Sequence, residues 1–513
     1  MWSGKSIAVI SRTRNLLVRQ PGVIVWAVLA YFILCVIMRV LRSDSLQNDE
    51  AEQAFLSQML LLGYGRQPPL YDWLQIGMNA LFGLSVATLS ALKNSLLFLC
   101  CIFYGLAARQ VMEDRRLPLI AMLGLLMVPS ISVLAQRDLT HAIATLCFVS
   151  LFLLAFLKTL DRPSLGSYIL LGLTVGLGFL TKYNFVIIPI AAIIAVLPEP
   201  DFRKRLLDWR MIPAMLVAAA IALPHLIWAL MNLDVATTGT VEAMREGASG
   251  DLARDSIRGL ISILLSTLKG TLPVIAIFAV IFYRDLGAVL RASDRWSRVI
   301  GWMIVVCLVL VTLIGLGFGA SSIRQKWLSP FQMLLPLYLT LKIAAARIDT
   351  RGSVARMGIP VMAIVTVSVL YFAVANIIAP YIGRYSKEHT PYQPMLEQVV
   401  GARNERPAFI LTDDLMMAGN ARLEFTSVPV LMPQLQPIAF ADAVRRGPGL
   451  IVWPLRDGRE GFSDDLAGFL KANDVSPASL KITYVDVPYN FAQEGDTMRF
   501  GYVWLEQVAL PQR

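Results

Sequence analysis

The sequence predicts a polytopic α-helical membrane protein with a small α/β domain at its C-terminal end. Of its 513 residues, 56% are hydrophobic and only 16% are charged. Apolar runs of about 20 residues recur along the chain, and a helix needs about that length to cross a bilayer. The spans are expected to be helices, because backbone polar groups cannot remain unpaired in lipid.

Eleven apolar segments are predicted to span the membrane. They are residues 22–41, 89–112, 117–134, 141–159, 165–181, 183–198, 211–231, 259–283, 299–318, 327–345 and 358–379. Residues 71–84 predict a further short span or a helix lying in the membrane interface, so the expected total is about 11–13 helices.

Lys and Arg concentrate in alternate loops, for example in residues 203–210 and 284–298. The positive-inside rule therefore places these loops and the N-terminus in the cytoplasm. The segment before the first span is basic and has no short cleavable apolar region, which predicts an uncleaved signal anchor. The net charge of +10 is explained by these loops, so no nucleic-acid partner is expected.

The polar tail predicts a second domain over residues 386–513, after a membrane domain over residues 1–385. The stretches "PAFILTDD", "GLIVWPL", "ITYVDVPY" and "RFGYVWLEQV" are typical of short strands. No catalytic motif is evident in this tail, and we expect it to cap the membrane part. All five cysteines lie in or beside apolar runs, which predicts buried thiols rather than a disulfide framework in the tail.

Carboxylates gather outside the first span. In "NDEAEQAFLSQMLLLG", apolar residues recur at helical spacing from Ala51 to Leu62, which predicts an amphipathic surface helix capped by Asn48 or Asp49. Asp49 and Glu50 lie at the start of this helix, and in one interpretation their carboxylates do no more than stabilise the positive end of the helix dipole. The alternative is a catalytic role.

Cations and a further carboxylate lie at the same predicted outer boundary: Arg137, Asp138, Lys182, Arg324 and Lys326. Cations stabilise a departing phosphate, and a carboxylate can remove the proton from an attacking hydroxyl. We therefore expect one cavity at the outer rim of the bilayer that acts on a lipid-linked phosphate. In the alternative interpretation, Lys182 snorkels to the interface and Arg137 pairs with Asp138.

Two further features leave alternatives open. The outer loop 232–258 is rich in Gly, Ser and Thr, and is either a flexible connector or a lid that closes over substrate. His141 is expected to be solvated or hydrogen-bonded rather than a ligand, and no dense metal-ligand spacing appears. No cofactor is expected, although Asp and Glu side chains leave a divalent cation open.

Several motifs follow one another in the first 200 residues: "NDEAEQAF", "GYGRQPPLYDWL", "RDLTHAIATLCF" and "LGLTVGLGFLTKYNF". "PHLIWALMN" and "QKWLSPFQMLLP" add weaker support. With these motifs the chain resembles the GT-C glycosyltransferases, in the branch of lipid A aminoarabinose transferases and rhizobial lipopolysaccharide galacturonosyltransferases. The resemblance implies a bacterial inner-membrane enzyme with a periplasmic C-terminal domain.

The resemblance also implies the reaction. A sugar on a polyprenyl phosphate is transferred, with inversion, to a lipopolysaccharide core or lipid A acceptor at the periplasmic face. Asp49 matches the usual candidate base, and the adjacent Glu50 would orient Asp49 or the sugar. Asp138 matches the acid of the second loop, and Lys182, beside Tyr183, matches the basic residue near the carrier phosphate.

One position departs from the aminoarabinose group. Where those relatives have an acid and a lysine before a proline, this chain has Arg66 and Gln67 before Pro68. Arg66 argues against a cationic amino sugar and favours an anionic donor such as galacturonic acid, through bidentate pairing with its carboxylate.

Two rival functions remain open from the sequence. Within the enzymes, the chain could be a protein O-mannosyltransferase or another cell-envelope glycan transferase. From another class, it could be a lipid-linked sugar flippase, but transporters place charges near the midplane of the bilayer and these lie at its edge.

Overall fold

A computed structural model describes residues 22–455, 461–493 and 495–506. The basic N-terminal segment, and with it the predicted signal anchor, begins outside the described residues. The chain divides into two compact units that interleave along the sequence. The first consists of residues 1–34, 61–71 and 93–368, and the second of residues 35–60, 72–92 and 369–513.

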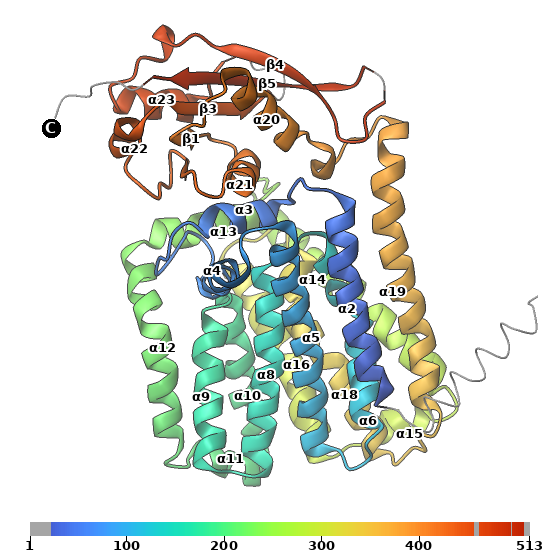
Figure 1. The fold of residues 1–513 in the computed structure, drawn as a ribbon. Coiled ribbons are helices and arrows are strands. Elements are labelled where there is room, and N and C mark those ends of the chain that lie inside the picture. The colour runs from blue at the N-terminus through green and yellow to red at the C-terminus, as the bar shows by residue number, and fades with distance from the viewer. Residues whose placement is uncertain (1–21, 456–460, 494, 507–513) are drawn as a thin grey trace, which may run out of the picture. The chain divides into compact units, whose positions relative to one another are not determined.

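The helices up to residue 382 (Figure 1) have the following bounds: α2 Val23–Arg42, α3 Asn48–Leu56, α4 Leu70–Phe82, α5 Val86–Val111, α6 Leu117–Leu126, η1 Ser130–Leu134, α7 Ala135–Asp138, α8 His141–Asp161, α9 Leu165–Phe179, η2 Tyr183–Val186, α10 Ile187–Val196, α11 Pro200–Leu206, α12 Met211–Met231, α13 Leu233–Met244, α14 Leu252–Ile281, α15 Leu286–Arg291, α16 Arg295–Gly317, α17 Gln325–Gln332, α18 Leu334–Ala345, α19 Ser353–Ile378 and η3 Ala379–Ile382.

The predicted membrane architecture is confirmed within the described part of the chain. Eight helices, with α17 and α18 taken as one, are long and apolar enough to span a membrane. A bent pair formed by Leu117–Leu126 and Ser130–Asp138, and two shorter apolar helices, correspond to the other three of the eleven predicted spans. The 13-residue α4 is too short to cross by itself, since it extends only about 20 Å.

Small residues allow the membrane helices of the first unit to approach closely. A Cβ on Gly172 of α9 would lie 2.1 Å from the carbonyl oxygen of Ala214 in α12, and Gly176 makes a similar approach one turn later. Such contacts bring backbones together in lipid, where packing rather than the hydrophobic effect drives association. Figure 1 shows α8, α9 and α12 running side by side.

Polar side chains lie at the points where membrane helices are interrupted. The pair α6 and η1–α7 is bent by 63° near Pro129, which has no backbone N–H to donate. Ser329 of α17 donates to Ser130 at this bend, at 2.7 Å. At the break between α17 and α18, the Tyr104 hydroxyl donates to the Met333 carbonyl and accepts from the Leu337 amide. These bonds satisfy backbone groups in an apolar interior.

Two local expectations need correction. The outer segment 232–258, predicted as a loop, is largely helical, because α13 covers Leu233–Met244 and α14 begins at Leu252. The helix predicted to run from Asn48 toward Leu62 ends at Leu56, and Gln47 rather than Asn48 or Asp49 occupies its cap position. The side chain of Glu50 accepts from the Gln47 amide, at 3.1 Å, and so satisfies a donor at the helix start.

The C-terminal segment has these elements: η4 Lys387–His389, α20 Tyr392–Arg403, β1 Phe409–Leu411, α21 Leu415–Glu424, β2 Val430–Leu431, α22 Phe440–Arg446, β3 Gly449–Pro454, α23 Asp464–Ala472, η5 Pro477–Ser479, β4 Thr483–Pro488 and β5 Thr497–Leu505. The strands form one sheet in the order β2-β1-β3-β5-β4. β1 pairs in parallel with β2 and β3, while β5 lies antiparallel between β3 and β4.

The four strands predicted in this segment are confirmed, and the two-residue β2 was not predicted. β1 and β3 are buried along their length, as strands covered on both faces are. Their core includes Phe409, Phe440 and Trp453. Side-chain caps at Asp414 and Ser463 begin the helices that follow β1 and β3. The division at residue 385 remains a prediction. All five cysteines are buried and free, as expected.

Candidate active site

The loop between α3 and α4 carries Arg66 and is attached to the first unit at several points. His225 of α12 bonds through Nδ1 to the carbonyl oxygen of Leu62, at 2.7 Å. The Leu70 amide donates to the Leu180 carbonyl, at 3.0 Å. His141 also bonds to the backbone of Pro68. These bonds fix the backbone on both sides of Arg66.

An aromatic stack supports the same loop. The His225 ring lies nearly parallel to Tyr183, with centroids 5.8 Å apart, and to Trp228 at 5.6 Å. Its Nε2 is 3.1 Å from the Tyr183 hydroxyl. Because Nδ1 donates to a carbonyl, Nε2 is left to accept, so the hydroxyl of Tyr183 donates to it. Gly63 lies against Trp228 so closely that a Cβ would be 2.1 Å from the ring.

Two predicted cations meet at His141. Arg66 and Lys182 both lie close enough to this buried ring to act on it electrostatically. Lys182 is half-buried in extended conformation directly before η2, and Arg66 is exposed beside Gly239 of α13. The structure thus brings together cations from two segments that are more than 100 residues apart in sequence.

The segment with Arg324 and Lys326 joins this region through η2. Asn184 donates to the Trp327 carbonyl of α17, at 2.9 Å, which ties the segment after Lys182 to the segment that carries Lys326. Arg324 is exposed and forms an ion pair with Glu246, at 2.6 Å.

Arg137 and Asp138 end the short helix α7. Arg137 is exposed and Asp138 is half-buried. The preceding Gln136 donates to Asn94 of α5, at 2.9 Å. Asn94 and its neighbour Lys93 are both buried, with 2% of each residue exposed.

Lys93, Asn94 and His225 were not predicted as site residues. A lysine inside an apolar run was the available signal for Lys93, since ionisable residues within spans are rare and usually functional. For His225, the "PHLIWALMN" motif was noted without a role.

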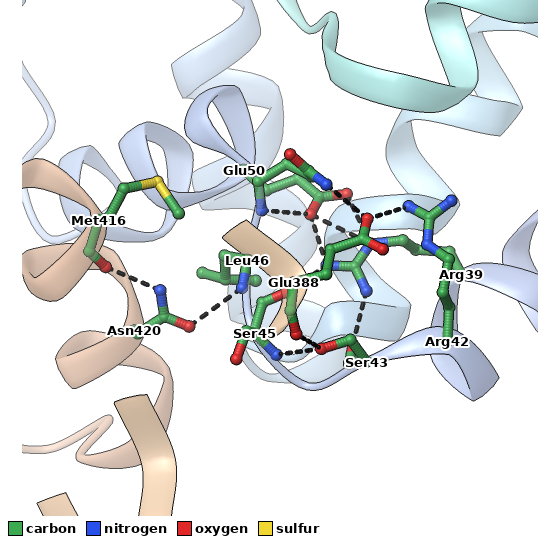
Figure 2. Close-up of polar contacts among 10 residues, drawn as sticks. Arg39, Arg42, Ser43, Ser45, Leu46, Glu50, Glu388, Met416 and Asn420 are labelled. Carbon is green, nitrogen blue, oxygen red and sulfur yellow. Dashed lines mark hydrogen bonds and ion pairs between the residues drawn. The ribbon is translucent and has the colours of Figure 1, made fainter. Parts of the chain in front are cut away.

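Asp49 and Glu50 belong to the second unit. Asp49 is half-buried and Glu50 is buried at the start of α3. Arg39 of α2 donates through Nε and Nη2 to both carboxylate oxygens of Glu50, with the shortest contact 2.6 Å (Figure 2). This bidentate pairing fixes the Glu50 side chain. The geometry therefore favours orientation of the helix start as the role of Glu50.

A second carboxylate of this unit is held by an amide. Gln53 of α3 donates to Asp72 of α4, at 2.8 Å. Burial raises the pKa of the Asp72 carboxyl well above its usual range, Glu52 acts in the same direction, and the bond from Gln53 opposes it. Asp72 thus lies in an environment that disfavours its charged form.

Comparisons with known proteins identify the class. The family model of dolichyl-phosphate-mannose-protein mannosyltransferases matches residues 66–228. The fold resembles the crystal structure of ArnT from Cupriavidus metallidurans bound to undecaprenyl phosphate, with a TM-score of 0.60 and 16% identity over 96% of this chain and all of that one. The protein thus has the GT-C fold of multi-pass membrane proteins.

Two curated relatives are much closer in sequence. Lipopolysaccharide core galacturonosyltransferases RgtA and RgtB of Rhizobium johnstonii are 39% and 40% identical over 484 and 485 residues. Each match covers 93% of this chain and 96% of the relative. The chain belongs to the family of these galacturonosyltransferases. The predicted family and enzyme class are confirmed, and the chain stands with transferases rather than with flippases.

Proposed function

We propose that this enzyme transfers a uronic acid, such as galacturonic acid, from a polyprenyl phosphate to a lipopolysaccharide core or lipid A acceptor. The names of the two curated relatives support the sugar and the acceptor. The undecaprenyl phosphate bound to the ArnT neighbour supports the carrier. The observation that carries the proposal is the pair of cations at His141, because a donor with phosphate and carboxylate groups requires positive charge.

In the proposed reaction, an acceptor hydroxyl attacks the anomeric carbon of the donor. The bond from that carbon to the phosphate oxygen breaks, and the polyprenyl phosphate leaves with the electron pair. Asp49 takes the hydroxyl proton as general base, and Glu50 orients the helix start that carries it. Asp138 is the second candidate carboxylate, for binding the acceptor.

The cations divide between the two anionic groups of the donor. Lys182, Arg137 and Lys326 would stabilise the phosphate as its charge develops, with Arg324 joining them if it leaves Glu246. The Tyr183 hydroxyl, held by His225, would border the phosphate beside Lys182. Arg66 would pair with the carboxylate of the uronic acid, because a guanidinium matches a carboxylate in a bidentate arrangement.

The orientation is part of the proposal. Loop charges favour a cytoplasmic N-terminus and a periplasmic C-terminal domain. Asp49, Glu50 and the cations would then work at the periplasmic face, where a lipopolysaccharide precursor is available to accept the sugar.

The first experiment tests the base. We expect purified Asp49→Asn to fold but to lose most transfer, about 100-fold or more, because a general base contributes about 10²–10⁴-fold. Asp44→Asn, in the same loop and exposed, serves as the matched control. Turnover by Asp49→Asn at the level of this control removes Asp49 from the mechanism.

The second experiment tests the sugar. Donors carrying galacturonate and galactose on the same polyprenyl phosphate are compared with the wild type and Arg66→Ala. A charge-assisted pair contributes about 1.5–3 kcal/mol, so kcat/KM should fall about 10- to 150-fold for the uronate alone. An equal loss for both donors assigns Arg66 to the phosphate, and no loss for either excludes it. A peptide acceptor in the same assay tests the mannosyltransferase alternative.

A further inference from the structure

The short loop between α2 and α3, residues 43–47, is bonded to the C-terminal tail (Figure 2), and so is Asn48, the first residue of α3. The pairs are Ser43 Oγ to the Glu388 carbonyl at 2.7 Å, Ser45 Oγ to the Thr390 carbonyl at 2.7 Å, the Leu46 amide to Asn420 Oδ1 at 3.0 Å, Gln47 Nε2 to Glu388 Oε1 at 2.5 Å, and Lys387 to Asn48. Asp49 follows directly after the last of these residues.

Two buried ion pairs enclose the same loop. Arg39 pairs with Glu50, and Arg42 pairs with Glu388 of the tail at 2.5 Å. All four side chains are less than 10% exposed. Gln47 links the pairs, because its side chain donates to Glu388 and its backbone amide donates to Glu50. Glu388 is therefore bonded directly to Gln47, the residue at the cap position of α3.

Packing of α21 on α3 holds the helix from another direction. A Cβ on Gly419 would lie 2.4 Å from the Cα of Ala51, so the two helices touch through their backbones. The adjacent Asn420 donates to the Met416 carbonyl, at 2.7 Å, which fixes the oxygen that accepts from Leu46. The tail thus supports both the loop and the first turn of α3.

We infer that the C-terminal tail fixes the position of Asp49 for sugar transfer, and that Glu388 is a positioning residue of the reaction. The inference rests on the proposed function of Asp49. It gives the tail a positioning part in the reaction, in addition to the capping role expected from the sequence.

The physical reason is the sensitivity of proton transfer to geometry. A displacement of about 1 Å in a reacting group can lower the rate about 100-fold. Without Glu388, the buried Arg42 has lost its carboxylate and Gln47 has lost its acceptor, so the loop relaxes where it enters α3. None of the cations proposed to bind the donor belongs to this loop, so donor binding should change little.

The test measures kcat and donor KM for Glu388→Ala and Glu388→Gln in the full chain, on monodisperse protein well below the melting temperature. We expect Glu388→Ala to lower kcat about 10- to 100-fold with donor KM within about twofold. Glu388→Gln keeps the acceptor for Gln47, and should recover part of kcat. Glu506→Gln, which breaks the ion pair with Arg403 in the same unit, should leave kcat unchanged.

A second variant keeps the inference testable if Glu388→Ala does not fold. Ser45→Ala removes the bond that the Ser45 hydroxyl donates to Thr390 and the bond that it accepts from Asn490, and should lower kcat by at least the roughly 3- to 10-fold expected for one hydrogen bond. Wild-type kcat in Ser45→Ala and in every folded Glu388 variant, alongside an inactive Asp49→Asn, overturns the inference and leaves the proposed function intact. An active Asp49→Asn overturns the function first.

Discussion

Removing the carboxylate of Glu50 should destabilise the second unit strongly. In Glu50→Ala, Arg39 keeps its charge in a site where only 4% of the residue is exposed. Breaking a buried ion pair by removing one partner costs about 3–5 kcal/mol. For a cooperative unit of about 200 residues, 1 kcal/mol shifts Tm by about 2–4 °C. The expected fall in Tm is therefore about 6–20 °C.

The double variant Arg39→Met/Glu50→Met separates the lost charge from lost packing. It removes both charges at similar volume, and such replacements are often neutral. Arg39 also donates to the carbonyls of Ser43 and Ser45, at 2.6 and 3.0 Å, and the double variant loses these bonds. We expect it to be less stable than the wild type but more stable than Arg39→Met alone.

The assay is thermal unfolding of the detergent-solubilised protein, followed by a probe in the second unit. Asp486→Asn, which breaks an exposed pair with Arg499, is the control and should shift Tm little, because exposed pairs contribute about 0–1 kcal/mol. A Glu50→Ala protein that melts within 2 °C of this control refutes the reasoning, since Arg39 would then tolerate burial alone (a shift of 2 °C is about 1 kcal/mol or less).

Two other perturbations have defined outcomes. Gly63→Ala should lower Tm and transfer activity, because its Cβ would lie 2.1 Å from the Trp228 ring. A second change, Trp228→Leu, should make room for this Cβ and restore part of the loss. Activity assays of the single and double variants check this. Hydrogen bonds from the Arg210 side chain and amide lower the pKa of Asp208. Its contribution to stability is therefore fully present above the ordinary carboxyl pKa of about 4, and is lost as pH falls through the lower pKa of the folded protein. Melting curves should therefore show Asp208→Asn less stable than the wild type at pH 7 and equal to it at low pH; a gap that persists at low pH contradicts the assignment.

The membrane helices could be predicted from the sequence because one property, apolar length, determines them. Each of the eleven predicted segments corresponds to a helix or a bent pair. Helix α13 escaped prediction because Gly239 and its three threonines lower helix propensity. The bend near Pro129 was hidden in a continuous apolar run.

The candidate site was predictable in part. Asp49, Lys182 and Arg66 became candidates because charged residues stand out beside apolar spans, and their roles stay predictions. Glu388 could not be found, since its neighbours in "YSKEHTPY" carry no motif and its partner Arg42 is almost 350 residues away. A pairing of that separation depends on the whole fold.

The separation of 345 residues between Ser43 and Glu388 has a consequence for biogenesis. The ribosome completes the loop of residues 43–47 early. It synthesises the bonding partners of this loop, which begin at Glu388, only after the last membrane-spanning helix. Until then the loop has none of its long-range partners. A chain that ends before this segment would therefore be inserted in the membrane with the loop before Asp49 unsupported. On this view the enzyme becomes active only after its C-terminal tail has been synthesised.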